Sequence, residues 1–317
     1  MCPFCFYFCM QIMLKTDMEN KKSLVGAWVE AARPRTLPAS VSPVLLGCAL
    51  AYYDGAFDVV PAVLCLLVAL FAQIASNFAN DYFDFKKGAD REDRLGPERA
   101  VAEGWITPKA MLTGTFVTLG LACAAGLLLV CFADWRLIGV GIAIAICVLA
   151  YSAGPFPLAY NGLGDVCVLL FYGVIPVCFT YYIQTLNFSL LSFLLSVALG
   201  LLSVNILIVN NYRDYEQDKA ARKRTTIVLF GRRAGRVFYV LNECMAFLLV
   251  LPLILDAPWW ILFLFGILFA LCFYTTRDLF TLEGRALNRT LGHTARNVFL
   301  FASVLSLLFL YIGGVSN

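Results

Sequence analysis

The stretch from Phe188 to Val209 reads FSLLSFLLSVALGLLSVNILIV and contains no charged residue. A helix needs roughly 20 apolar residues to cross the hydrocarbon core of a bilayer. This stretch is therefore long enough to span a membrane, and the charged segment after it would lie at the membrane surface. The rest of the chain has a similar character, because 61% of its 317 residues are hydrophobic and only 14% are charged. That composition excludes an ordinary soluble domain, which needs more polar surface to cover its core.

Apolar stretches of this kind recur along the chain and predict an all-α integral membrane protein. Backbone groups in lipid must be satisfied internally, so the spans are expected to be helices. We expect a single membrane domain at 24–317, a bundle of about nine helices around a central cavity. We expect residues 1–23 to form a poorly ordered extension, in which Met13 or Met18 is a candidate translation start. The predicted spans fall near 37–53, 59–79, 109–132, 137–153, 164–184, 188–209, 235–255, 258–275 and 298–315.

The positions of the basic residues predict how the bundle is oriented. With a cytoplasmic N-terminus, all of the 24 Lys and Arg residues except Arg136 lie on the cytoplasmic side. Loops rich in Lys and Arg stay in the cytoplasm, and one missed span would move the later loops to the other side. We therefore expect a multi-pass protein of a bacterial cytoplasmic membrane, with its C-terminus outside. Basic residues confined to short loops do not favour a nucleic-acid partner.

An acidic segment follows the second span and reads NFANDYFD over residues 77–84. On a helix, Asn77, Asp81 and Asp84 stand at i, i+4 and i+7, so they share one face. Carboxylates at a membrane boundary are costly unless they are paired or bound to cations. The segment therefore predicts a functional site at the cytoplasmic end of this helix.

A second acidic segment follows the sixth span and reads NNYRDYEQD over residues 210–218. Asn210, Asp214 and Asp218 stand at i, i+4 and i+8, again on one helical face. Two such segments predict a Mg²⁺ site, because Mg²⁺ takes carboxylate oxygens, keeps some water and bridges to phosphate. We expect two ions that bridge a diphosphate. The predicted ligands are Asp81, Asp84, Asp214 and Asp218, which would also be the catalytic residues, with Asn77 and Asn210 as auxiliary groups.

Basic side chains beside the second acidic segment are candidates for contacts to the diphosphate. A diphosphate leaving group gains negative charge as its C–O bond breaks, and Mg²⁺ and basic groups stabilise that charge. Arg213, Lys223 and Arg224 are placed to help. A cation-coupled transporter is the alternative from another class, but its acids would follow a path through the membrane. Phosphatidyl-group transfer is less favoured still, because we find no D-G-x-x-A-R segment.

These segments resemble the UbiA superfamily of intramembrane prenyltransferases, whose signatures are N-D-x-x-D and D-x-x-x-D. Within it, the chain is most similar to the 1,4-dihydroxy-2-naphthoate polyprenyltransferases. Gly88 stands where the superfamily often has a third acid, with Asp90 two residues on, and Asp165 stands where a glutamate is common. Besides the acidic segments, the resemblance rests on EAARPRTLP at 30–38, RLGPERAV at 94–101, YSAGPFPL at 151–158 and NRTLGHTAR at 288–296.

The resemblance implies a cavity that opens sideways to lipid. It implies Mg²⁺-dependent transfer of a polyprenyl group from polyprenyl diphosphate to 1,4-dihydroxy-2-naphthoate, with loss of CO₂, giving demethylmenaquinone for menaquinone synthesis. Arg33 or Arg35 would hold the carboxylate of the acceptor, and Tyr151 would orient a ring hydroxyl. Other acceptors (4-hydroxybenzoate, homogentisate or a haem vinyl group) stay open, as do prenyl length and oligomeric state. The expected substrate-binding residues are Asn77, Asn80, Arg33, Arg35, Tyr151, Arg213, Lys223 and Arg224.

Overall fold

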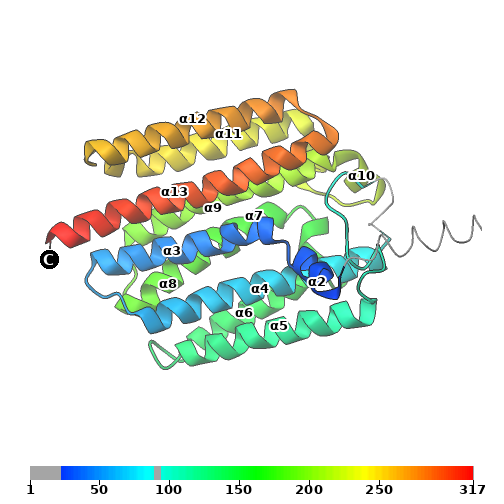
Figure 1. Ribbon diagram of the computed structural model, residues 1–317, viewed down its shortest axis with the longest axis horizontal. Helices are drawn as coiled ribbons and strands as arrows, with labels where there is room; N and C mark the ends of the chain where they lie inside the picture. The colour runs from blue at the N-terminus through cyan, green and yellow to red at the C-terminus, as the bar shows by residue number, and fades with distance from the viewer. Residues whose placement is uncertain (1–22, 89–93, 317) are drawn as a thin grey trace, which may run out of the picture.

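The computed structural model describes residues 23–88 and 94–316, and this part of the chain is an all-helical bundle (Figure 1). Eight helical segments are long and apolar enough to cross a membrane, and Leu137–Ala150 is a shorter apolar helix. This confirms the predicted multi-pass bundle of about nine helices. The predicted N-terminal extension, apart from Ser23, and Asp90 lie outside the described residues.

Several helices extend further than hydropathy predicted, and α12 is one of them because it continues to Thr281. Helix α4 continues to Lys86, α11 starts at Thr226 and α13 starts at Leu287. Hydropathy marks where lipid ends, whereas a helix can continue into the polar surface region. The helices are α2 (Leu24–Ala32), η1 (Pro34–Thr36), α3 (Leu37–Tyr53), α4 (Val59–Lys86), α5 (Pro108–Leu129), α6 (Leu137–Ala150), η2 (Leu158–Tyr160), α7 (Gly164–Leu169), η3 (Leu170–Val174), α8 (Ile175–Thr185), α9 (Leu190–Arg213), α10 (Tyr215–Ala220), α11 (Thr226–Leu255), α12 (Trp259–Thr281), η4 (Gly284–Ala286) and α13 (Leu287–Ser316).

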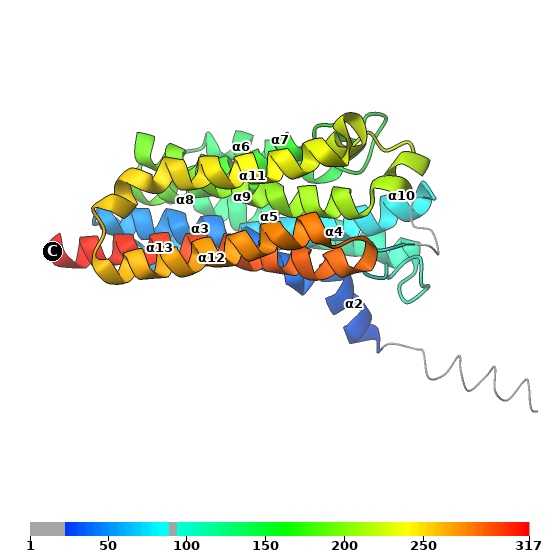
Figure 2. The same ribbon diagram turned by 90° about the horizontal axis from the view of Figure 1, so that it is seen from above.

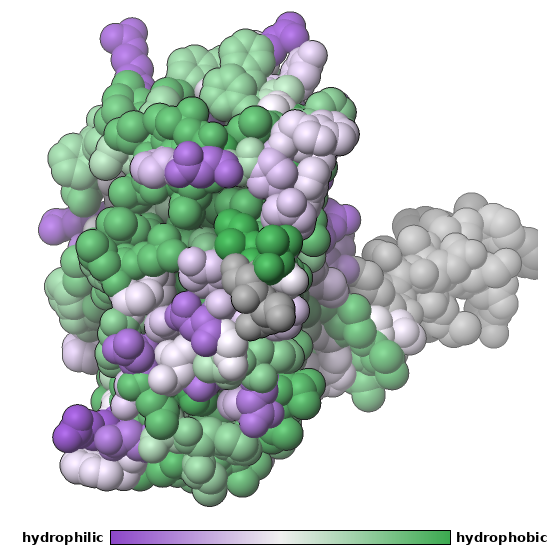
Figure 3. Space-filling model, turned by 90° about the vertical axis from the view of Figure 1, so that its left-hand side faces the viewer, coloured by the Kyte–Doolittle hydropathy of each residue, from purple (hydrophilic) through white to green (hydrophobic). Residues whose placement is uncertain are grey.

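The long helices run side by side along the long axis of the molecule, and the two ends of the bundle differ (Figure 1). The described C-terminus and the short connections lie at one end, where apolar residues cover most of the surface (Figure 3). The ends of α4 and α9, helix α10 and the longer connections lie at the other end (Figure 1). Helix α2 packs against α4 and projects from the side of the bundle (Figure 2). Both acidic segments are therefore at the same end.

The helices differ in how tightly they are packed. Helix α9 contributes Leu195 and Leu199 to the main core, where α13 contributes Phe301 and Leu305. The π-helical turn η3 lies directly against α9, where a Cβ on Gly173 would come within 2.5 Å of the Cα of Gly200. In contrast, no residue of α6 is buried. One side of the bundle is therefore a firm core, and the other leaves room for a cavity.

Candidate active site

A cavity of about 700 Å³ lies between α3, α4, α5, α6, α8 and α9. Its wall along α5 and α6 is apolar, and two residues of that wall, Leu127 and Ile142, are 58% and 56% exposed. The cavity therefore opens between these two helices toward the lipid side of the bundle. Its opposite, polar end is lined by Asn80, Asp84, Arg94, Arg99, Asn210, Arg213, Lys223 and Asn288.

Asp84 is the residue of the first acidic segment that brings a carboxylate into the cavity wall. The Tyr160 hydroxyl donates a hydrogen bond of 2.8 Å to its Oδ1. The Arg99 guanidinium lies 3.5 Å from its Oδ2. Helix α4 remains regular past Asp84, so Asn77, Asp81 and Asp84 keep the helical spacing that the sequence predicted.

Asp81 has different surroundings from those that we predicted for a metal ligand. Its side chain is buried, and its two oxygens accept hydrogen bonds from the backbone N–H groups of Ala100, at 3.1 Å, and Val101, at 3.2 Å. It is not among the residues that line the cavity. Asn77 does line the cavity, but its amide donates to the Ala32 carbonyl at 2.9 Å and accepts from Gln73. Helix α4 thus turns Asp81 toward the 100–101 turn and Asp84 toward the cavity.

The second acidic segment is less regular than the predicted helical stripe. Helix α9 ends at Arg213, and Asp214 caps both α9 and the short helix α10. Hydrogen bonds from Asp214 N to Asn210 O and from Asp218 N to Asp214 O nevertheless keep the three side chains in helical order. The break lets the chain change direction while Asn210, Asp214 and Asp218 remain close together.

Arg213 is buried and holds the second segment together. Its guanidinium donates to both carboxylate oxygens of Asp214, at 2.7 and 2.6 Å. It also donates to the Oδ1 atoms of Asn210, at 2.9 Å, and Asn288, at 2.6 Å. Such bidentate pairing balances the charge of Asp214. Arg213, predicted as a phosphate contact, therefore already uses four of its five N–H donors within the protein.

Asp218 lies beside Lys223, whose Nζ is 3.5 Å from one carboxylate oxygen. The other oxygen is buried and has no hydrogen-bond partner among the described residues. Burial raises the pKa of Asp218 from 3.8 to about 6; Lys223 opposes this shift, whereas the negative charges of Asp214 and Asp84 add to it. A buried carboxylate oxygen without a donor suits a cation as its partner.

Tyr160 connects the two acidic segments. Its hydroxyl donates a hydrogen bond to Asp84, and the Nζ atoms of Lys87 and Lys223 lie 4.2 and 5.5 Å from the centre of its ring. Lys223 in turn contacts Asp218. The two helix ends are therefore close enough to act on one substrate.

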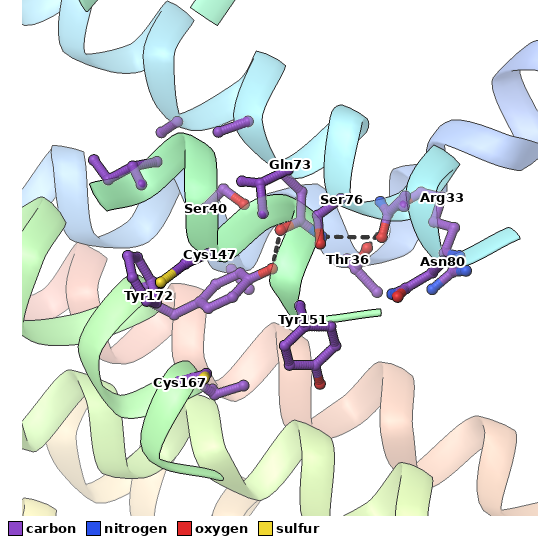
Figure 4. Close-up of a pocket in the computed structure, with 18 of the residues that line it drawn as sticks. Arg33, Thr36, Ser40, Gln73, Ser76, Asn80, Cys147, Tyr151, Cys167 and Tyr172 are labelled. Carbon is purple, nitrogen blue, oxygen red and sulfur yellow. Dashed lines mark hydrogen bonds between the residues drawn. The ribbon is translucent and has the colours of Figure 1, made fainter. Parts of the chain in front are cut away.

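Most of the predicted substrate-binding residues line the cavity, and one does not. Arg33, Arg35, Asn80, Tyr151 and Lys223 are part of the wall. The Arg33 and Asn80 side chains lie on one side of the close-up, with Tyr151 between them and Tyr172 (Figure 4). The Ser152 hydroxyl donates to Asn80. The Arg224 side chain is exposed and outside the wall, although its backbone N–H bonds the Tyr160 carbonyl at 3.0 Å.

Sequence reasoning missed several residues of the wall. Arg99 was quoted only as part of a resemblance, and Tyr160 lies two residues beyond the YSAGPFPL stretch at 151–158 and was not quoted with it. Gln73 and Tyr172 belong to two of the membrane-spanning segments and are joined by a hydrogen bond (Figure 4). A polar residue inside an apolar span is a signal that marks Gln73. No comparable signal marks Tyr160.

The donor set of the polar end fits a Mg²⁺ ion. Within residues 23–88 and 94–316, no group of three or more His, Cys, Asp and Glu side chains lies close enough to hold a metal alone. Mg²⁺ does not require one, because it is commonly held by one or two carboxylates together with water and substrate phosphates. Asp84, Asn80 and Asn210 offer oxygens in the cavity wall. Asp218, like Asp214, is outside the wall, but it contacts the wall residue Lys223. The unpartnered oxygen of Asp218 is the observation that favours a cation here.

Comparison with known proteins places this architecture in a family. The sequence profile of the UbiA prenyltransferase family matches residues 40–304. The chain belongs to the UbiA prenyltransferase family. It is 37% identical to the 1,4-dihydroxy-2-naphthoate octaprenyltransferase of Haemophilus influenzae over 235 residues, which cover 72% of this chain and 76% of the relative. It is 38% identical to the enzyme of the same name from Mycobacterium tuberculosis, covering 73% and 79% of the two chains.

Solved structures of UbiA proteins have the same fold. A UbiA homolog from Archaeoglobus fulgidus, bound to GPP and Mg²⁺, superposes with a TM-score of 0.66 over 91% of this chain and 98% of that one. The two sequences are 19% identical. The UbiA bundle predicted from the sequence is therefore confirmed by both the profile and the fold.

Proposed function

We propose that this UbiA-family protein transfers a polyprenyl group from polyprenyl diphosphate to 1,4-dihydroxy-2-naphthoate. The C–O bond between the prenyl group and the diphosphate breaks, and a C–C bond to the ring forms. The ring carboxylate leaves as CO₂ and diphosphate is released. Because no oxidant takes part, the immediate product is the reduced form of demethylmenaquinone. The identity of 30–38% to bacterial enzymes with this name supports the acceptor.

The observation that carries the proposal is a single cavity with a charged end and an apolar wall. A polyprenyl diphosphate has the same division into a charged head and an apolar tail. The head would lie beside Lys223 and Arg99, and the tail along α5 and α6 toward the opening at Leu127 and Ile142. Tyr151 and Arg33 line the cavity between these regions, where the acceptor would meet the first prenyl carbon.

Mg²⁺ would be held at the polar end by Asp84, Asp214 and Asp218, with Asn80 and Asn210 as further oxygen donors. Bound there, it supplies positive charge to the departing diphosphate. The protein itself contributes Lys223 and Arg99, whose charges stabilise the same leaving group. The aromatic rings of Tyr151 and Tyr172 offer π-faces to the allylic cation. We propose that two such ions bind, and a titration of Mg²⁺ bound per chain would test that number.

We also propose that the end with the acidic segments faces the cytoplasm of a bacterial cell, with the C-terminus outside. Support comes from the basic loops, because they lie at the acidic end of the bundle and such loops stay in the cytoplasm. A cysteine-labelling experiment on Ser23→Cys and Ser316→Cys variants of a chain whose native cysteines have been replaced would report which end is accessible from outside.

The activity is tested by incubating membranes that contain the chain with Mg²⁺, octaprenyl diphosphate and one aromatic acid at a time. We expect a product of the mass of prenylated, decarboxylated naphthoate, with 4-hydroxybenzoate and homogentisate giving none. Product from another acid would refute 1,4-dihydroxy-2-naphthoate as the acceptor but would still support the proposed prenyl transfer. No product from any of the acids, in membranes that contain folded protein, would refute the proposed function.

A further inference from the structure

The connection between α4 and α5 includes a segment, residues 94–101, that crosses the charged end of the cavity; we call it the 94–101 strap. Four of its residues, Arg94, Pro97, Glu98 and Arg99, line the cavity. Arg99 is 8% exposed and lies 3.5 Å from the Asp84 carboxylate. The strap therefore adds the basic side chains of Arg94 and Arg99 to the charged end of the cavity.

The Asp81 carboxylate holds one end of this strap. It accepts the N–H groups of Ala100 and Val101, the two residues that directly follow Arg99. Both residues are buried in a small apolar cluster with Ala27, Phe78 and Met111. Backbone N–H bonds to an ionised carboxylate are charge-assisted and strong. The position of the Arg99 backbone is thus fixed by Asp81.

Asn288 and Arg213 hold the other end. The Asn288 amide donates to the Leu95 carbonyl at 2.9 Å, and its Oδ1 accepts from Arg213 at 2.6 Å. Gly96 lies on the Arg213 guanidinium, where a Cβ would come within 2.7 Å of Nη2. The strap therefore connects the end of α4 to the end of α9.

We infer that Asp81 is a positioning residue, which holds the 94–101 strap so that Arg99 faces the diphosphate. This inference rests on the proposed function for the identity of the diphosphate ligand. It separates the two acids of the first segment by role: Asp84 contacts the reacting groups, and Asp81 acts through the strap. A residue that acts through the strap should change how firmly the strap is held, as well as how well the donor binds.

The test compares Asp81→Asn with Asp84→Asn in the full-length protein. An asparagine at 81 keeps one acceptor and turns an amide toward a backbone N–H, so one of the two bonds to the strap is lost. We expect the KM for farnesyl diphosphate to rise at least about tenfold, with the Mg²⁺ half-saturation within about twofold of wild type. For Asp84→Asn we expect the Mg²⁺ half-saturation itself to rise at least about tenfold.

A second readout is independent of turnover. Trypsin cleavage after Arg94 and Arg99, followed by mass spectrometry, measures how often the strap detaches from the rest of the protein. We expect cleavage to be faster in Asp81→Asn than in wild type and unchanged in Asp84→Asn. Unreactive farnesyl thiodiphosphate with Mg²⁺ should slow the cleavage in wild type. Gly96→Ala, which disturbs the other end of the strap, should behave like Asp81→Asn.

Glu103→Gln is the matched control, because Glu103 is exposed in the same connection and outside the cavity. It should leave both readouts unchanged. The inference is overturned if Asp81→Asn raises the Mg²⁺ half-saturation as much as Asp84→Asn, or if its tryptic cleavage matches that of wild type. A wild-type chain without prenyl transfer would count against the proposed function instead, while the cleavage comparison would still decide the role of Asp81.

Discussion

The two acidic segments follow the same Asn-then-Asp order, yet the protein balances their charges differently. The second segment carries its own bases, since Arg213 is next to Asp214 and Lys223 is five residues after Asp218. The first segment depends on distant parts of the chain: the 100–101 turn for Asp81, and Tyr160 and Arg99 for Asp84. The second segment is therefore organised locally, whereas the first is completed only when the bundle has formed.

Replacing an acid that faces the cavity should have the largest effect. We expect Asp84→Ala to lower prenyl transfer by a factor on the order of a thousand or more, because it removes a group that stabilises developing charge. Removing divalent cations with EDTA should abolish the activity of the wild type, and Mg²⁺ should restore it. Product formation is measured by mass spectrometry on folded, membrane-extracted protein. An Asp84→Ala variant that keeps substantial turnover would contradict the assignment.

Loss of Arg213, the base next to Asp214, should lower the stability of the folded protein. Arg213→Ala would leave Asp214 and two asparagine oxygens without their donor in a buried site. Removing one partner of a buried ion pair costs about 3–5 kcal/mol. We expect a clear drop in the thermal unfolding midpoint in detergent. Lys223→Ala should lower it much less, because Lys223 is itself 20% exposed and makes one 3.5 Å contact, whereas Arg213 is 1% exposed and lies 2.6 Å from its partner. Equal unfolding midpoints for the two variants would refute the expectation that the second segment depends more on Arg213 than on Lys223.

The link between the segments is tested at Tyr160. Tyr160→Phe removes the hydroxyl on Asp84 and keeps the ring between Lys87 and Lys223, so we expect a loss of activity of about tenfold. Tyr160→Ala removes the ring as well and should lose more. Steady-state kinetics on both variants measure the difference. If Tyr160→Phe were as active as wild type, the hydroxyl would have no part in orienting Asp84.

The raised pKa of Asp218 predicts a dependence on pH. Its pKa is raised from 3.8 to about 6, so the carboxyl is largely neutral below that pH and charged above it. Protons and Mg²⁺ compete for the same oxygens, so the Mg²⁺ half-saturation should fall as the pH rises through about 6. The pKa of Asp218 is higher in the folded protein than in the unfolded chain. The free energy of unfolding of the metal-free protein should therefore fall as the pH rises from about 3.8 to about 6. Asp218→Asn should remove this part of the pH profile.

Arg224 should show the smallest effect. Its side chain is exposed, and its contact to Tyr160 is made by the backbone, which alanine preserves. We expect Arg224→Ala to change kcat/KM by less than about threefold, as is usual for surface substitutions. Lys223→Ala, one residue away and in the cavity wall, is the matched comparison and should lose more. A large loss in Arg224→Ala would place its side chain on the substrate after all.

The sequence allowed the spans and the helical ends that carry both acidic segments to be predicted, because each rests on a periodicity or a charge pattern within one stretch. It did not distinguish the two carboxylates of the first segment. Asp81 and Asp84 are three residues apart on one helix, and only the packing of the 94–101 strap decides which one meets backbone amides. Tyr160 was missed for the same reason, since its role depends on Asp84 and Lys223, which are far away in the chain.

Helix α6 has a consequence for the membrane around the protein. With 14 residues it is about 21 Å long, shorter than the roughly 30 Å of a typical hydrocarbon core. Such hydrophobic mismatch is relieved by thinning of the adjacent leaflets. The thinned patch would adjoin the gap beside α5, where acyl chains are the neighbours of the cavity. Isoprenoid units that extend beyond the gap would then be dissolved in lipid, so a longer donor would gain little affinity from the protein.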